Sequence, residues 1–392
     1  MKNKKFVLYF RYLLFFFLII QIVYSCVSFK GNKPVQTEIE EMINTVSIKV
    51  MSDSFSPNDD KISDYLVFEL TNKKAEFNPV LNWELTIYNA EDKIVFTHKR
   101  KYDLPEEYVW NGKGNDNKVL SDGKYYAGLR VDFINGSFAT EKSNEFYIDT
   151  TPPDIEVKED KKYFSPDNDG IDDELTFQFV KANDMTGIKN WKLVILNPLT
   201  NKEFAVFSGD GSPKTDIIWN GIGNNGKLVE SAEEYPVQII SEDLVGNKIL
   251  KEVSPVLVDI LVEKLGDGRY KIRVSSIRFK PNLPVMTDYE RNMDILDLLA
   301  NALKKFPEHK ILIEGYANYW RKGLSEKRGY NLSYNRALLV SDELNKRGIE
   351  KDRMTVKGRG YENPIIPLRP NMTYEEKLEM GVNRRVEFYL EK

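Results

Sequence analysis

Few side chains in this sequence have the chemistry to catalyse a reaction or bind a transition metal. Cys26 is the only cysteine, and the two histidines, His98 and His309, lie far apart in the chain. A single thiol excludes an intramolecular disulfide bond and a Cys₄ or Cys₂His₂ zinc site. Two separated imidazoles exclude a His-rich metal centre and argue against a Ser-His-Asp hydrolase. We therefore expect a binding or structural protein rather than an enzyme, with no cofactor.

An acidic segment around Gly170 is the one place where a metal ligand pattern appears. Residues 167–174 read Asp-Asn-Asp-Gly-Ile-Asp-Asp-Glu, and Ca²⁺ takes about six to eight oxygen ligands around a sharp turn. The candidate ligands are Asp167, Asp169 and Asp173. The bidentate glutamate of an EF-hand loop is absent, and a related segment has Lys61 in place of the glycine. An Asx-rich turn is therefore the favoured interpretation, with calcium binding as the alternative.

The chemistry of Cys26 depends on the segment before it. Four basic residues precede an apolar run at 12–24, which suits the core of a signal peptide; a membrane-spanning helix needs about 20 residues. The run ends at Ser25-Cys26 and resembles the lipobox of bacterial lipoproteins. That resemblance implies cleavage before Cys26 and an acyl/diacylglycerol lipid, including palmitate-type chains, on its new amine and thiol. The alternative is an uncleaved anchor with an incidental cysteine, and both alternatives tether the protein to a membrane.

The sequence between the N-terminus and position 261 contains a duplication. Residues 55–64 match 164–173, residues 82–87 match 190–195, and the Trp-Asn-Gly triplet at 110–112 recurs at 219–221. Because these landmarks keep register, we predict a signal peptide at 1–25, a lipidated tether at 26–44, and repeats at 45–151 and 152–261. Short alternating runs between Asn-Gly and Asp-Gly turns predict a β-sandwich for each repeat.

The two repeats resemble the immunoglobulin-like domains of the flagellar-hook-cap type. The Phe-Ser-Pro motif, the strand tryptophan and the Trp-Asn-Gly triplet carry this resemblance. Four of the five tryptophans occupy repeated positions, where they could stack on carbohydrate or fill the sandwich core. Their placement within strand patterns favours the core.

Residues 262–392 have a different pattern, which predicts an α+β sandwich of the order β-α-β-α-β followed by a last strand. Helical spacing predicts a helix at 289–306, and Ser333 is expected to cap a second helix that runs to Lys346. Alternating runs predict strands at 270–279, 309–317, 353–358 and 384–390. The complete fold class is thus two all-β sandwiches followed by an α+β domain.

Four short motifs follow one another in this last domain. They are Ile-Glu-Gly-Tyr-Ala-Asn at 313–318, Leu-Ser-Tyr-Asn-Arg-Ala at 332–337, Gly-Arg-Gly at 358–360 and Asn-Arg-Arg-Val-Glu at 383–387. Their order and spacing resemble the OmpA-like peptidoglycan-binding domain. The resemblance implies a pocket for the zwitterionic end of the diamino acid in the peptidoglycan stem peptide. In the family an aspartate holds the ammonium and an arginine the carboxylate; the matching positions here are Asn318 and Arg336.

The main departure from that family pattern is the neutral Asn318. An uncharged contact contributes about 0.5–1.5 kcal/mol against about 1.5–3 kcal/mol for a charged one. Three alternatives follow from this departure: binding is weaker, the ligand differs, or another residue supplies the negative charge. The candidates for that residue are Glu314 and Glu326. Further candidates for the pocket are Tyr316, Arg384 and Arg385, and because residues alternate along a strand, only one of the two arginines should face it. Trp320 could contact the pocket wall or simply pack.

Charge is divided unevenly along the chain and favours the same interpretation. The net charge of −4 gives no basic signature for nucleic acid, but residues 262–392 carry +7 and the remainder −11. A basic end suits the carboxylates of peptidoglycan stems. We therefore expect a non-catalytic lipoprotein on the outer membrane, facing the periplasm, that binds peptidoglycan. The alternative is a scaffold or adhesion module whose repeats bind an unknown protein partner, with the last domain serving for retention.

Overall fold

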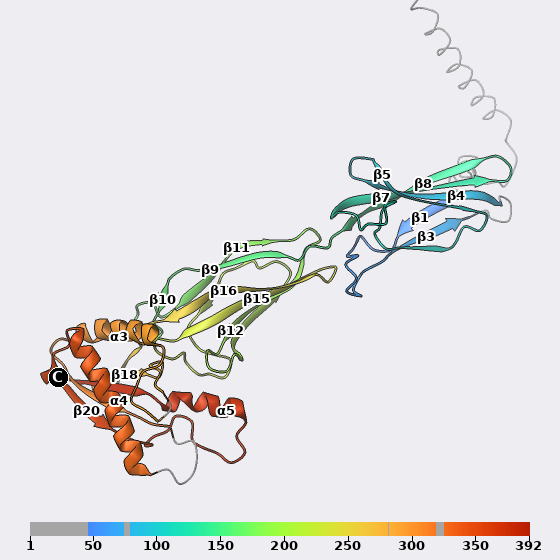
Figure 1. The fold of residues 1–392 in the computed structure, drawn as a ribbon. Helices are drawn as coiled ribbons and strands as arrows, with labels where there is room; N and C mark the ends of the chain where they lie inside the picture. Colours follow the sequence, from blue (N-terminus) through green and yellow to red (C-terminus); the bar gives the residue numbers. More distant parts are fainter. Residues whose placement is uncertain (1–45, 74–78, 281, 319–324) are drawn as a thin grey trace, which may run out of the picture. The chain divides into compact units, whose positions relative to one another are not determined.

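The structure is a computed structural model that describes residues 46–73, 79–280, 282–318 and 325–392 (Figure 1). Cys26, its signal segment and Trp320 lie outside these residues. The chain forms two compact units: one comprises residues up to Phe55 together with Tyr65–Ile148, and the other comprises Ser56–Asp64 and Asp149–Lys392. Within the described ranges, no helix is long and apolar enough to span a membrane.

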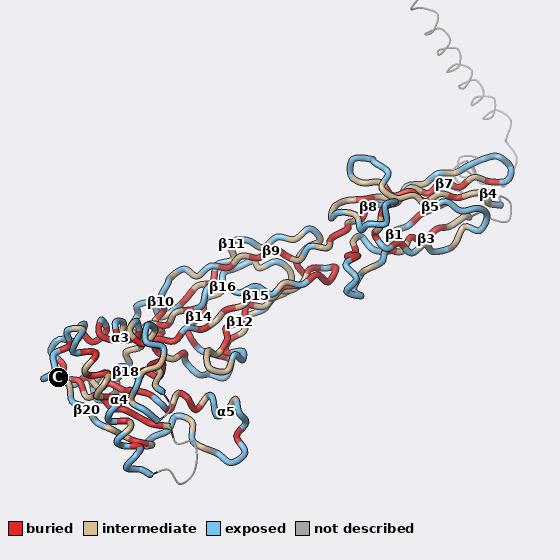
Figure 2. Tube along the Cα trace, viewed as in Figure 1, coloured by how far each residue is buried: buried red, intermediate tan, exposed pale blue. Residues whose placement is uncertain are grey.

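The first unit is built from two β-sheets that enclose one apolar core. The smaller sheet has the order β1-β3-β6 and the larger sheet β2-β8-β7-β4-β5. Buried residues alternate with more exposed ones along most strands, as Figure 2 shows, because successive side chains point to opposite faces. The strands are β1 (Val46–Val50), β2 (Ser54–Phe55), β3 (Leu66–Asn72), β4 (Val80–Asn89), β5 (Ile94–Lys101), β6 (Glu107–Trp110), β7 (Gly123–Phe133) and β8 (Phe138–Ile148).

The second unit begins with a sandwich that repeats this strand order. The smaller sheet of this sandwich has the order β14-β11-β9 and the larger sheet β10-β16-β15-β12-β13. Each strand of the second sandwich therefore has the same place as the strand numbered eight lower in the first sandwich. The duplication seen in the sequence is therefore also a duplication of topology. The strands are β9 (Asp154–Glu159), β10 (Tyr163–Phe164), β11 (Leu175–Asn183), β12 (Ile188–Leu196), β13 (Glu203–Asp210), β14 (Ile217–Trp219), β15 (Glu234–Asp243) and β16 (Lys248–Val258).

The repeated tryptophans fill the two sandwiches, as expected. Trp83, Trp110 and Trp219 are at most 4% exposed and belong to the apolar cores. Trp191 is half-buried, and its ring stacks edge-on against Phe179 at 5.0 Å. The four tryptophan rings pack against neighbouring side chains of the sandwiches. They therefore do not form the exposed platform that stacking on carbohydrate would need.

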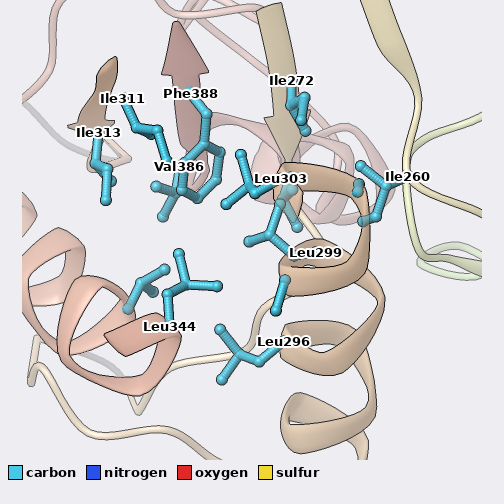
Figure 3. Packing of buried hydrophobic residues seen from close by; sticks show 14 of the residues in the cluster. Ile260, Ile272, Leu296, Leu299, Leu303, Ile311, Ile313, Leu344, Val386 and Phe388 are labelled. Atoms are coloured by element: carbon cyan, nitrogen blue, oxygen red, sulfur yellow. The ribbon is translucent and has the colours of Figure 1, made fainter. Parts of the chain in front are cut away.

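A five-stranded sheet with helices on one face completes the second unit. Its order is β17-β18-β21-β19-β20, and β19 and β20 run parallel while the other neighbours are antiparallel. Leucines of α3 and α4 pack onto the inner face of the sheet (Figure 3). The elements are β17 (Val262–Lys264), β18 (Tyr270–Val274), α3 (Tyr289–Lys304), β19 (Lys310–Gly315), α4 (Glu326–Lys346), η1 (Lys351–Arg353), β20 (Met354–Gly358), α5 (Tyr374–Glu379), η2 (Met380–Asn383) and β21 (Val386–Glu391).

The predicted β-α-β-α-β order is confirmed, but the start of the second helix was wrong. Helix α4 begins at Glu326 after Ser325, and Ser333 lies inside it. The Ser333 hydroxyl donates to the carbonyl of Tyr330 at 3.0 Å and accepts from the amide of Gly360 at 2.9 Å. Ser333 therefore ties α4 to the loop after β20 instead of capping the helix. The strand expected at 270–279 is also shorter, ending at Val274.

Candidate functional site

Two asparagines lie where β19 and β21 meet at one end of the sheet. Asn318 follows β19, and Asn383 ends η2 just before β21. The side-chain amide of Asn383 donates to Oδ1 of Asn318 at 3.3 Å and to the carbonyl of Ile366 at 2.7 Å. Asn383 also accepts from the amide of Ile366 at 3.0 Å, so its orientation is fixed. The sequence identified the first asparagine as a site residue but not the second.

Arg336 reaches the same end of the sheet from α4. Gly315 and Gly358 let the helix approach closely, because a Cβ atom at either position would collide with the α4 backbone. The Arg336 guanidinium donates to the carbonyls of Leu283 at 3.2 Å and Lys280 at 3.1 Å. Burial and the nearby charge of Arg384 lower the pKa of Arg336 to about 10, so it remains a cation at neutral pH.

Arg384 is an exposed cation next to Arg336. Among the residues that the structure describes, its guanidinium has no hydrogen-bond or ion-pair partner. Loss of hydration and the charge of Arg278 lower the pKa of Arg384. Two neighbouring guanidiniums without an intervening carboxylate repel each other, and an added anion would relieve that repulsion.

Arg385 points to the opposite side, as strand alternation predicts, and lies in a buried network. It donates through Nε to Glu387 at 2.7 Å, and both side chains are 4% exposed. Its guanidinium also stacks on the ring of Tyr316 at 3.8 Å. Burial would raise the pKa of Glu387, but the contact with Arg385 and the charge of Lys271 lower it overall. Arg385 therefore stabilises the fold and is not available for a ligand.

Glu314 and Tyr316 are also committed to the interior, which corrects their assignment as pocket residues. The Tyr316 hydroxyl donates to Glu314 at 3.0 Å, and Arg359 pairs with the same carboxylate. Burial, the charge of Glu387 and the bond to Glu314 raise the pKa of Tyr316, so the phenol stays protonated. Of the two glutamates that could replace the missing charge at position 318, Glu314 is thus already neutralised.

Comparison with known families bears on this site directly. The OmpA family model matches residues 278–373, which include both the asparagine at 318 and Arg336. These residues form an OmpA family domain. The match supports peptidoglycan binding in general and an envelope location. A second model, the type IX secretion signal domain CHU_C, matches residues 48–148, which correspond to the first sandwich.

Solved structures similar to the OmpA domain come from several bacteria. The periplasmic domain of Helicobacter pylori MotB is 21% identical, with 33% of this chain and 78% of that chain covered and a TM-score of 0.28. An outer membrane protein from Borrelia burgdorferi is 30% identical, covering 34% and 97%, with a TM-score of 0.26. The cell wall anchor of the Pseudomonas aeruginosa type VI secretion system is 23% identical, covering 33% and 86%, with a TM-score of 0.27. No curated protein matches the chain.

Beside the two asparagines, the OmpA domain has a hollow of about 360 Å³ that the sequence did not reveal. Glu326 and Asn383 lie on its wall. The other lining residues are Tyr330, Tyr361, Glu362, Pro364, Ile366, Leu368 and Met380. Most of them belong to the segment after β20, which contains no motif that we could interpret from sequence.

The acidic segment around Gly170 folds as a turn. Carboxylate oxygens of Asp167, Asp169 and Asp173 lie within 4.8 Å of one another. Asp173 accepts backbone amides of Asn168 and Gly170, and Asp169 accepts that of Ile171 at 2.7 Å. This geometry is that of the favoured Asx-rich turn. A second cluster, which the sequence did not reveal, brings together Asp149, Asp184 and Asp243.

Proposed function

We propose that this chain is a bacterial envelope lipoprotein whose OmpA domain binds peptidoglycan without covalent chemistry. Membership of that domain in the OmpA family and the charge of +7 on residues 262–392 support the proposal. The sandwiches then separate the anchor from the bound wall. The protein acts as a link between a membrane and the wall and catalyses no reaction.

One observation carries the proposal: the guanidinium of Arg384, which has no partner among the described residues, lies next to Arg336 and follows Asn383, which donates to Asn318. The ligand that this arrangement fits is a carboxylate, because planar guanidiniums bind carboxylates in a bidentate manner. Free carboxylates occur at the ends of peptidoglycan stem peptides. Asn318 and Asn383 add neutral amide groups for further hydrogen bonds.

A pelleting assay with purified sacculi tests this function. Arg336→Ala in the full chain is expected to reduce retention about tenfold, since a charge-assisted hydrogen bond is lost. Arg353→Ala is a matched control, because the Arg353 guanidinium likewise donates to two backbone carbonyls, those of Phe306 at 2.7 Å and His309 at 3.1 Å. Both variants lose two hydrogen bonds from a guanidinium to backbone carbonyls, but only Arg336→Ala should show the reduced retention on sacculi. Equal retention of the two variants would rule out the carboxylate contact.

The lipid anchor at Cys26 is the second part of the proposal. Several acyl chains give stable membrane attachment, whereas one chain binds only reversibly. Metabolic labelling with a palmitate analogue should mark the wild-type chain, and Cys26→Ser should abolish the label. Label that persists in Cys26→Ser would refute the lipoprotein assignment. Fractionation of the labelled protein then tests the outer membrane location.

The first sandwich favours a second candidate function. Its match to a type IX secretion signal domain points to a module that another protein recognises, in line with a scaffold or adhesion role for the repeats. Deletion of residues 51–259 separates the two candidates. Wall binding should survive the deletion under both, and loss of a defined co-purifying partner would show that the repeats carry a function of their own.

A further inference from the structure

Residues 259–261 link the second sandwich to the OmpA domain, between the end of β16 and the start of β17. Ile260, in the middle of this linker, is 4% exposed and packs beside α3 in the apolar core of the OmpA domain (Figure 3). The amide of Leu261 donates to the hydroxyl of Ser231 in the sandwich at 3.1 Å. A flexible hinge has few buried contacts and a solvated backbone, and this linker has neither property.

Two glutamates in the turn before β15 pair with arginines of the OmpA domain. Glu233 is 3% exposed and lies between Arg278 at 2.6 Å and Arg291 on α3 at 2.7 Å. Glu230 is half-buried and pairs with Arg273 on β18 at 3.1 Å. A buried carboxylate loses its hydration, and its guanidinium partners compensate for that loss only while the two domains stay in contact. These pairs therefore fix the position of one domain against the other.

The corresponding turn of the first sandwich lacks these pairs, although the two sandwiches share one topology. The hydroxyl of Tyr125 donates to the carbonyl of Ser121, four residues earlier in the chain. In the second sandwich the hydroxyl of Tyr235 accepts the amide of Glu230, five residues earlier. The second turn is thus one residue longer, and it carries Glu230 and Glu233 where the first turn has no glutamate. The repeats have diverged at the surface that meets the OmpA domain.

We propose that the second sandwich and the OmpA domain act as one rigid body, with Glu233 as the clamp between them. Ala232, beside the clamp, is 7% exposed and belongs to the apolar core of the OmpA domain, so the joint combines ion pairs with apolar packing. In the membrane–wall link proposed above, a pull on the chain enters the OmpA domain through this joint as well as through residues 259–261. That mechanical role rests on the proposed function, whereas the rigid joint does not.

Distances between two spin labels measure the stiffness of the joint in the full chain. Cys26→Ser removes the native thiol, and Glu252→Cys on β16 and Glu308→Cys after α3 place one label on each domain at exposed positions. In this background, Glu233→Gln removes the charge of the clamp at almost constant volume. Glu234→Gln is the matched control, because Glu234 is the next residue, is exposed and has no ion pair among the described residues.

We expect one narrow distribution of label distances for the wild-type joint and for Glu234→Gln, and a broader distribution for Glu233→Gln. Because two arginines lose their buried partner, Glu233→Gln should also lower the midpoint of thermal unfolding by about 10 °C. If Glu233→Gln does not fold, Glu230→Gln decides, since it removes the half-buried pair with Arg273 and should likewise broaden the distribution.

Three results would overturn the proposal. They are a broad distribution for the wild-type joint, a distribution for Glu233→Gln that is as narrow as that of the control, and an unchanged distribution for Glu230→Gln where that variant decides. A lower thermal midpoint with unchanged distances would show that Glu233 only stabilises the fold. Pelleting with sacculi tests the function separately, because a wild-type chain that does not pellet would refute peptidoglycan binding and leave the joint intact.

Discussion

Neighbouring arginines at the start of β21 show two different uses of charge in the OmpA domain. Arg385 is buried, pairs with Glu387 at 2.7 Å and stacks on Tyr316. Arg384, one residue earlier, is exposed and has no partner among the described residues. The difference follows from strand alternation, which sends one side chain into the network behind the sheet and the other to the proposed ligand face.

This contrast separates Arg385, whose charge a carboxylate neutralises, from Arg384 and the buried Arg336, which have no carboxylate partner among the described residues. A buried ion costs several kcal/mol in lost hydration unless a partner compensates it, so Arg385 and Glu314 must be paired. An exposed ion has no such requirement, so Arg384 needs no partner for the domain to be stable.

Arg385→Ala should cause the largest loss of stability. Among the described residues it leaves the buried Glu387 with Lys271 at 3.1 Å as its one cation, and the unfolding free energy should fall by about 3 kcal/mol. Urea denaturation of the full chain, followed by tryptophan fluorescence and circular dichroism, measures the change. A loss below about 0.5 kcal/mol, which is ordinary for surface substitutions, would show that the network does not stabilise the fold.

Arg384→Ala should have the opposite profile. We expect unchanged stability, within about 0.5 kcal/mol, and about tenfold weaker retention on sacculi. Arg269→Ala serves as control, because Arg269 is a half-buried arginine just before β18 whose guanidinium is already paired with Asp267 and Glu391. Should Arg384→Ala destabilise the fold, or bind as the control does, the division between the two arginines fails.

The carboxylates of Asp149, Asp184 and Asp243 extend the contrast to a cluster of like charges that forms no salt bridge among the described residues. Burial and the charge of Asp184 raise the pKa of both Asp149 and Asp243. A carboxyl group whose pKa is higher in the folded state than in the unfolded state binds its proton more tightly when the protein is folded. Its contribution to stability is complete below the unfolded pKa and is lost as the pH rises through the folded pKa. Acidification from pH 7 toward the unfolded pKa of an aspartate, about 3.9, should therefore strengthen the contribution of this cluster.

Asp184→Asn tests that crowding. With a chelator present, it should raise the unfolding free energy at pH 7 by about 1 kcal/mol and reduce the gain on acidification, because a repelling charge is gone. Calorimetry at pH 7 and at about pH 4 gives both quantities, with the exposed Asp210→Asn as control. Destabilisation at both pH values would contradict this account.

Asn318→Asp should have the smallest effect. It restores the charge that the family pattern has at this position, but Asn318 is only half-buried, so solvent screens the added charge. We expect sacculus binding to stay within about threefold of wild type, the scale of a screened surface interaction. A gain of tenfold or more would contradict this expectation and place a cationic group of the wall at position 318.

The sequence predicted those features that depend on local pattern. The repeats, their core tryptophans, the β-α-β-α-β order, and the different faces of Arg384 and Arg385 all follow from spacing. Features that depend on contacts between distant segments were missed. Ser333 was taken as a helix cap because its bond to Gly360 joins residues that are far apart in the chain. The hollow was missed for the same reason, since α4 and the segment after β20 meet only in the folded domain.

The central claim is that the guanidiniums of Arg336 and Arg384 bind carboxylates of the wall. Amidation of the free carboxylates in purified sacculi removes that partner and leaves the protein unaltered. We predict that the full-length wild-type chain pellets with untreated sacculi and binds amidated sacculi about tenfold more weakly. Equal binding to both preparations would contradict the claim.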